Sequence, residues 1–315
     1  MITLFRKKYR LTSVTANDVE IALGHWPGPG PTVLCLHGLT ANHKCWVLAA
    51  EDLQKHGFNV YAMDLRGRGR SDKPRDAYGV EVHARDVIGV IRSLGKLRVH
   101  LLCHSFGCNV GIRVAAEFPK SVRSMILMDG GGVLSVRQKL RIIGVLEPSF
   151  RRLLGAYRDE DAYLNALKES PFITEWSDMI EDHFRYEMEH TPEGVRCNIP
   201  AYVIETEMSA LGGSMTPGRI ARKIIARPGR FIEKARRNNN PPYSAISRPV
   251  LILRAGKHNL APGDDLLPAE AVERMLREIP GARAHEFPTA NHYGIIGDDL
   301  PERDQMIRDF FREHA

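Results

Sequence analysis

The stretch 99–111 constrains the fold of this chain more than any other part of its sequence. An apolar run at 99–103 predicts a buried strand, and a helical pattern begins at Gly107. Ser105 stands between them, with Cys103 and Gly107 two positions away on either side. A strand, a tight turn and a helix form an elbow that holds a serine in strained backbone geometry, with its hydroxyl exposed above a sheet. The motif is usually G-x-S-x-G, and the small side chain of Cys103 permits it to replace the first glycine.

Strands and helices alternate along much of the chain. A continuous apolar run at 32–36 is typical of a strand buried on both faces of a parallel sheet, and further strand-like runs occur at 59–63, 122–128 and 250–254. Helical patterns separate them, so the sequence predicts a doubly wound α/β fold with a mostly parallel central sheet. A Rossmann nucleotide site is the natural competitor. The sequence does not favour such a site, because the loop that contains Gly67 and Gly69 does not lead into a helix that begins with glycine. No acidic residue follows at the expected spacing either.

The alternation stops between the strand at 122–128 and the one at 250–254. The intervening region is polar, helical in pattern and interrupted by prolines. A compact domain does not use about 110 residues as unstructured loop. We therefore predict two core segments, 1–133 and 248–315, with a helical cap or lid at 134–247 inserted after the sixth strand.

The charge pattern leaves two interpretations open. The chain carries a formal net charge of +6, but it has no basic stripe interleaved with aromatic residues and no recognised nucleic-acid-binding motif, so we expect no nucleic-acid partner. Arginine and lysine concentrate at 137–152 and 219–237. These segments form either solvated helix faces or a positive potential that attracts anionic substrates to a nearby cleft.

Neither the apolar runs nor the cysteines indicate export or membrane insertion. The apolar runs are shorter than the roughly 18 residues that cross a bilayer, and no apolar block follows the positive charges near the N-terminus. The five cysteines are odd in number, and Cys35, Cys103 and Cys108 lie in predicted strands or helices. Buried thiols fit this placement better than disulfides or a metal site. We expect a reduced, cytoplasmic protein without a membrane partner.

The motifs, taken in chain order, resemble those of one superfamily. They are His37-Gly38, Asp64-Leu65-Arg66-Gly67-x-Gly69-x-Ser71-x-x-Pro74, Cys103-His104-Ser105-Phe106-Gly107 and Asn291-His292-Tyr293. Together they look like the α/β-hydrolase fold superfamily, in its branch with a serine nucleophile and an inserted helical cap. The resemblance covers roughly residues 20–132 and 245–315, and leaves the cap segment unidentified.

The resemblance implies roles for several residues. Ser105 is the nucleophile, and His292, on a glycine-flanked loop after the last predicted strand, is the base. A serine needs such a base, and histidine takes and returns a proton near neutral pH. The backbone amides of Leu39 and Phe106 map to the oxyanion donors. Gly38 and His104 are expected to line the substrate pocket.

The third member of the triad has more than one candidate. The usual position after the strand at 250–254 falls on Asn259, which carries no charge. Asp264 is followed four residues later by proline and precedes His292 by 28 residues, as the superfamily's acid does, so we favour it. Asp129 is the alternative, because some members place the acid after the preceding strand. Asp265 is a minor third candidate.

The predicted activity follows from the serine. Dehalogenases and epoxide hydrolases of this fold carry an aspartate at the elbow, so Ser105 favours acyl transfer to water. We expect a cofactor-free and metal-free serine hydrolase that cleaves a small carboxylic ester, and the basic segments favour an anionic one. Hydrolysis of a C–C bond, a lactone or a thioester, and a non-catalytic ligand receptor of the same fold, are the alternatives. The sequence leaves the oligomeric state open.

Overall fold

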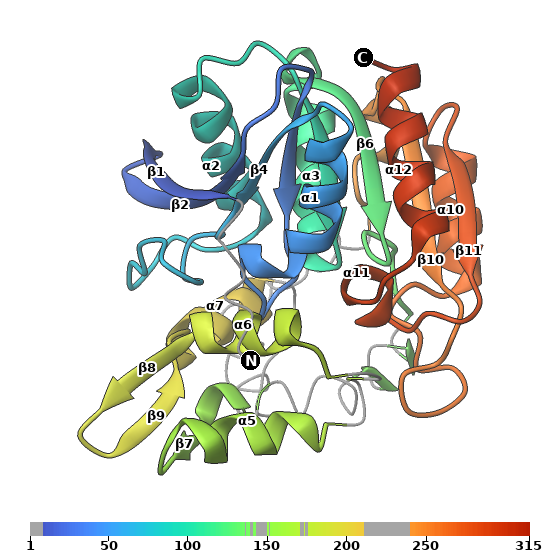
Figure 1. The fold of residues 1–315 in the computed structure, drawn as a ribbon. Coiled ribbons are helices and arrows are strands. Elements are labelled where there is room, and N and C mark those ends of the chain that lie inside the picture. The colour runs from blue at the N-terminus through green and yellow to red at the C-terminus, as the bar shows by residue number, and fades with distance from the viewer. Residues whose placement is uncertain are drawn as a thin grey trace, which may run out of the picture.

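The main sheet has the predicted α/β architecture (Figure 1). The computed structural model describes residues 9–135, 137–138, 141–142, 150, 152–170, 173, 176–210 and 240–315. Within these residues, eight strands form one sheet in the order β1-β2-β4-β3-β5-β6-β10-β11. Their bounds are β1 Arg10–Ala16, β2 Val19–Trp26, β3 Thr32–Leu36, β4 Asn59–Met63, β5 Val99–His104, β6 Val122–Met128, β10 Val250–Ala255 and β11 Arg283–Phe287.

The sheet is parallel from β4 to β11, and β1 and β2 add an antiparallel edge. All five side chains of β3 are buried, as its continuous apolar run predicted, and all six of β5 are buried too, His100 and His104 included. Fully burying one large apolar side chain contributes roughly 1.5–3 kcal/mol, so these central strands hold the site above them in a rigid frame. The predicted fold class is confirmed.

Alternate residues of the strands divide the core between two faces. Leu34, Leu101 and Ile252 belong to a cluster with helices α2, α3 and α10. Val33 and Leu102 face the opposite way and pack with α1, α11 and α12. The helix bounds are α1 Val47–Lys55, α2 Val80–Ser93, α3 Phe106–Glu117, α10 Ala269–Glu278, α11 Gly294–Gly297 and α12 Pro301–Glu313, and three 3₁₀ turns are η1 His43–Trp46, η2 Pro119–Ser121 and η3 Tyr243–Ala245.

The cap segment (residues 134–247) is not wholly helical. It contains α5 Glu160–Lys168, α6 Asp178–Tyr186 and α7 Ala201–Ala210. It also contains the short strands β7 Ala156–Tyr157, β8 Met188–Thr191 and β9 Gly194–Cys197, which form an antiparallel sheet in the order β7-β9-β8. These strands were not predicted from the sequence, because runs of two to four residues are too short to establish a period of two.

The cap elements gather beyond one end of the main sheet (Figure 1). Their apolar cluster, which includes Tyr163, Phe184 and Val203, also contacts Leu39 and Tyr78 of the core. The loops that follow β3 and β4 therefore contact the cap segment. The basic stretch 219–237 lies outside the described residues, as does much of 137–152. None of the helices described in the structure combines the length and the apolar character needed to cross a membrane.

Candidate active site

Ser105 lies on a strained turn between β5 and α3. Its backbone has φ 53° and ψ −117°, in the left-handed half of conformational space that non-glycine residues rarely occupy. Glycines make room for the turn: a Cβ at Gly107 would overlap the carbonyl of Leu36, and one at Gly130 would overlap the carbonyl of Ser105. The backbone has the geometry of the predicted elbow.

Cys103 stands where the elbow motif usually has its first glycine, and the structure accommodates its thiol. The side chain is fully buried and faces Gly111 of α3, where a Cβ would lie 2.6 Å from the cysteine Sγ. The thiol thus fills space that a glycine on the facing helix leaves open. Burial raises the pKa of Cys103, so the group is a neutral packing residue.

His292 joins Ser105 to a carboxylate. It lies in the loop between β11 and α11, and its Nε2 is 3.1 Å from Ser105 Oγ. Its Nδ1 is 2.7 Å from Oδ2 of Asp129, the residue that follows β6. With Nδ1–H donating to the carboxylate, Nε2 is free to accept the serine proton. The two contacts join residues 187 and 163 positions apart in the chain, and both His292 and Asp129 are buried.

Asp129 is itself fixed by β10. Its Oδ1 accepts a hydrogen bond from the Ala255 amide at 3.0 Å, and its own amide donates to the Leu253 carbonyl at 2.8 Å. Both bonds cross to the neighbouring strand, so Asp129 holds a positive φ of 46° without freedom to turn away from His292.

Asp264, the acid that the sequence analysis favoured, does not contact His292 in the structure. Its two carboxylate oxygens accept hydrogen bonds from the backbone amides of Asn259, Leu260 and Ala261. Asp264 therefore organises the lengthened loop after β10, and Asp129 occupies the position beside the base that we had assigned to Asp264. The loop still reaches the site, since Asn259 Oδ1 lies 3.3 Å from the His292 amide.

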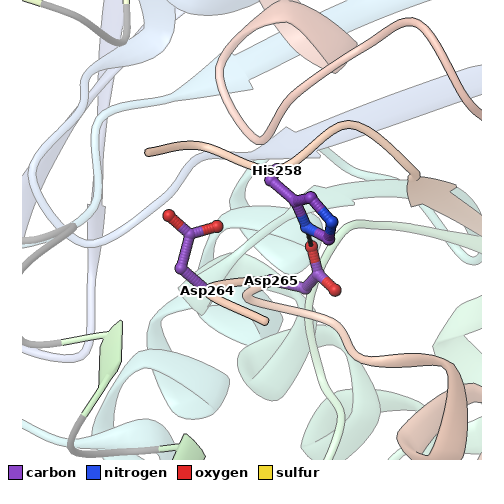
Figure 2. A group of neighbouring side chains, drawn as sticks. All are labelled: His258, Asp264 and Asp265. Atoms are coloured by element: carbon purple, nitrogen blue, oxygen red, sulfur yellow. Dashed lines mark hydrogen bonds and ion pairs between the residues drawn. The ribbon is translucent and has the colours of Figure 1, made fainter. Parts of the chain in front are cut away.

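Figure 2 shows Asp264 beside Asp265 and His258, a group whose ligand-type atoms lie within 4.8 Å of one another. His258 Nδ1 is 2.8 Å from Asp265 Oδ1, and Arg254 approaches the other oxygen of Asp265 at 3.4 Å. The carboxylates are thus satisfied by backbone amides, an imidazole and a guanidinium. We assign no metal site to this group.

The loop that carries Leu39 passes directly beside Ser105. A Cβ added to Gly38 would lie 3.3 Å from Ser105 Cβ and 3.7 Å from Ser105 Oγ. His37 orients this loop, because its Nε2 accepts from the Leu65 amide at 3.0 Å and its Nδ1–H donates to the Gly38 carbonyl at 2.7 Å. A trans peptide points its C=O and N–H in opposite directions, so this bond also directs the Leu39 amide.

Two further features fit an oxyanion hole. Burial lowers the pKa of His37 to about 3, so the ring stays neutral near pH 7 and keeps its two hydrogen bonds. Phe106 is the first residue of α3, and the first amides of a helix have no partner within it. The residues predicted as oxyanion donors, Leu39 and Phe106, therefore flank Ser105.

His104, predicted to line the pocket, contacts His292, the predicted base. Its side chain is 5% exposed, and its Nε2 lies 3.0 Å from the backbone carbonyl of His292. The two rings are 4.6 Å apart and inclined at 33°. Burial lowers the pKa of His104, so the neutral ring donates to that carbonyl through Nε2–H. His292 lies 188 residues away in the chain, so the sequence indicated His104 only as part of the elbow motif.

Comparison with known proteins identifies the family. The sequence model described as the alpha/beta hydrolase fold matches residues 31–299. The chain belongs to this family. One relative of this alpha/beta hydrolase is the 2-(acetamidomethylene)succinate hydrolase of Mesorhizobium japonicum, 27% identical over 87% of this chain and 85% of that protein. Another is the N-formylmaleamate deformylase of Pseudomonas putida, 33% identical over 37% of this chain and 44% of the relative.

A solved structure shares the fold. The crystal structure of E-2-(acetamidomethylene)succinate hydrolase superposes with a TM-score of 0.75 and 22% identity, over 96% of this alpha/beta hydrolase and 99% of that chain. This likeness supports the fold. The family and the relatives together support a hydrolase.

Proposed function

We propose that this alpha/beta hydrolase cleaves a small carboxylic ester through an acyl-enzyme intermediate, with Ser105 as nucleophile, His292 as base and Asp129 as the acid that orients the base. The observation that carries the proposal is the hydrogen-bonded chain from Ser105 Oγ through both ring nitrogens of His292 to Asp129 Oδ2. A serine, an imidazole and a buried carboxylate in this order are the arrangement that activates a hydroxyl for acyl transfer.

In the first half-reaction, Ser105 Oγ attacks the ester carbonyl carbon while His292 Nε2 takes the hydroxyl proton. The carbonyl electron pair moves to its oxygen, which the amides of Leu39 and Phe106 receive. When the bond to the alcohol breaks, the alcohol oxygen takes the proton from Nε2 and the acyl group stays on Ser105. Asp129 stabilises the imidazolium that exists between these two proton transfers.

In the second half-reaction, water replaces the alcohol. His292 takes a proton from the water, whose oxygen attacks the acyl carbon, and the same amides receive the second oxyanion. Ser105 then leaves with the proton from Nε2, and the carboxylic acid is released. Each oxyanion donor is worth on the order of 3 kcal/mol where its removal has been measured in serine hydrolases.

An N-acyl (amide) bond is the second candidate, and an anionic substrate suits either bond. The names of the relatives favour both ideas, since one contains an acetamido group on succinate and the other denotes removal of a formyl group from a maleamate. The net charge of +6 is consistent with attraction of such anions. Hydrolysis of monomethyl succinate and of methyl valerate, compared at low and high salt, tests the anionic preference. Equal turnover of the two at low salt contradicts it.

The triad is tested by replacing the nucleophile. Ser105→Ala should remove nearly all hydrolysis of p-nitrophenyl acetate, and Ser93→Ala, on the exposed end of α2, serves as the matched control. Wild-type enzyme should release a burst of p-nitrophenol followed by steady turnover, and a fluorophosphonate should label the peptide that contains Ser105. Retained turnover in folded Ser105→Ala contradicts the proposal, and tight ester binding without a burst favours a receptor. Parallel assays with p-nitroacetanilide measure the amide activity.

A further inference from the structure

Buried guanidinium groups hold two consecutive carbonyls of the oxyanion loop (residues 37–40). Arg68 Nε donates to the Leu39 carbonyl at 3.0 Å, and Arg152 Nη2 donates to the Thr40 carbonyl at 2.9 Å. Arg68 is 0% exposed and Arg152 is 7% exposed. A loop at the surface would bond these carbonyls to water. Here they are bonded to cations that are themselves removed from water.

Each of these arginines is paired with a buried glutamate of the cap segment. Arg68 Nη1 lies 2.8 Å from Glu207 Oε1 on α7, and Arg152 Nη1 lies 3.2 Å from Glu187 Oε1 at the end of α6. Both glutamates are 0% exposed. The pair formed by Arg68 and Glu207 is the more informative, because Arg68 belongs to the core loop after β4 and Glu207 to the cap segment.

A buried guanidinium is stable only when a counter-charge accompanies it. Glu207 supplies that charge, and His83 of α2 binds the same carboxylate oxygen. Burial raises the pKa of Glu207, but the nearby His83 and Arg68 outweigh this effect and lower it to about 2, so Glu207 is ionised near pH 7. Arg68 also donates through Nη1 to the Arg66 carbonyl at 2.8 Å, which fixes the plane of its guanidinium.

The bond from Arg68 matters because of where it falls. His37 holds the Gly38 carbonyl, which fixes the peptide plane before the Leu39 Cα, and Arg68 holds the Leu39 carbonyl, which fixes the plane after it. With both planes fixed, Leu39 has no soft backbone dihedral left, and its amide has one direction. The first constraint comes from the core alone. The second depends on a carboxylate of the cap segment.

We propose that Glu207 is a positioning residue for the oxyanion hole. Through Arg68 it fixes the peptide plane between Leu39 and Thr40, so that a carboxylate of the cap segment helps to orient the Leu39 amide. This inference rests on the proposed function, because it assigns a catalytic consequence to the Leu39 amide. In this role the cap segment contributes to the stabilisation of the transition state, in addition to any contact that it makes with the substrate.

The test uses Glu207→Gln and Arg68→Lys in the full-length enzyme. A glutamine removes the counter-charge at nearly constant volume. A lysine keeps a positive partner for Glu207 but has no planar fork to reach the Leu39 carbonyl as well. We expect kcat for p-nitrophenyl acetate to fall about 10- to 100-fold in each variant, because small misplacements of a catalytic group cost up to about 100-fold. KM should change much less. Glu205→Gln, exposed on the same helix, is the matched control.

The affinity for a trifluoromethyl ketone supplies the readout that a merely structural role would not move. This inhibitor forms a tetrahedral adduct with an oxyanion, so its affinity should fall in parallel with kcat/KM if the hole is misaligned. If the variants lower the free energy of unfolding but leave the kcat and ketone affinity of the folded enzyme within twofold of wild type, the proposal is wrong. Should Glu207→Gln fail to fold, Arg68→Lys decides by the same criterion. Failure of the proposed function itself would show separately, as turnover retained in Ser105→Ala.

Discussion

Asp129→Asn is the substitution that most directly tests the geometry of the site. Asp129 uses Oδ1 for the Ala255 amide at 3.0 Å and Oδ2 for His292 Nδ1 at 2.7 Å. Asparagine has one oxygen, and if that oxygen keeps the Ala255 amide, the NH₂ group faces the imidazole. An NH₂ group only donates, so Nδ1 must accept and the ring proton moves to Nε2. A protonated Nε2 cannot take the proton of Ser105.

The loss is expected to be large and specific to the reaction. The same change of tautomer lowers kcat by about 10⁴-fold in a serine protease triad. A tenfold change in rate corresponds to about 1.4 kcal/mol, so we expect a loss of about 5 kcal/mol of transition-state stabilisation here. Stopped-flow assays with p-nitrophenyl acetate should show that the burst phase slows, because acylation needs the proton transfer. Circular dichroism and urea unfolding should show a folded protein.

Asp264→Asn is the matched control, since it makes the same chemical change at the acid that the sequence favoured. In the contacts that the structure describes, the Asp264 carboxylate accepts hydrogen bonds from backbone amides of its own loop, so its substitution should loosen residues 259–261 and lower kcat less than about tenfold. The assignment of Asp129 is refuted if Asp129→Asn stays within tenfold of wild type, or if Asp264→Asn loses more activity than Asp129→Asn does.

Two other features lead to measurable expectations. Gly130→Ala should lower the free energy of unfolding by about 1–3 kcal/mol or more, because the new methyl group would overlap the Ser105 carbonyl. Urea unfolding measures this loss, and an unchanged urea midpoint would contradict the packing. Burial lowers the pKa of His37 and His100 to about 3 and lowers that of His104 as well. The unfolded chain then binds more protons than the folded one below about pH 6.5, so stability is full above that pH and is lost as the pH falls toward 3. Each such histidine adds a slope of up to about 1.4 kcal/mol per pH unit, and equal unfolding free energies at pH 7 and pH 5 would argue against neutral buried rings.

The sequence allowed much of the core to be predicted because its signals are local. The apolar run at 32–36 is continuous, and the elbow around Ser105 is indicated by one uninterrupted stretch, 99–111. His292 could be placed because it follows the last strand on a glycine-flanked loop. These features depend on neighbours in the chain, and the structure places Ser105 and His292 at one site.

The choice between the two candidate acids is not local. β6 and β10 are neighbours in the sheet although the whole cap segment separates them in sequence, so Asp129 and the loop of Asp264 end up beside the same histidine. The cross-strand bonds of Asp129 to Leu253 and Ala255 hold its carboxylate toward this histidine, whereas amides of its own loop hold the carboxylate of Asp264. The pairing of Arg68 with Glu207 spans 139 residues and has no signal in the sequence for the same reason.

The anchoring of Asp129 to β10 also governs how this enzyme can be rebuilt with a foreign lid. Because Leu253 and Ala255 hold the acid from the neighbouring strand, a graft joined beyond Gly132 should leave the triad aligned, whatever the length of the new segment. The donor lid must still bring a carboxylate to the place of Glu207. A chimera without one would leave the buried guanidinium of Arg68 without its counter-charge beside the oxyanion loop.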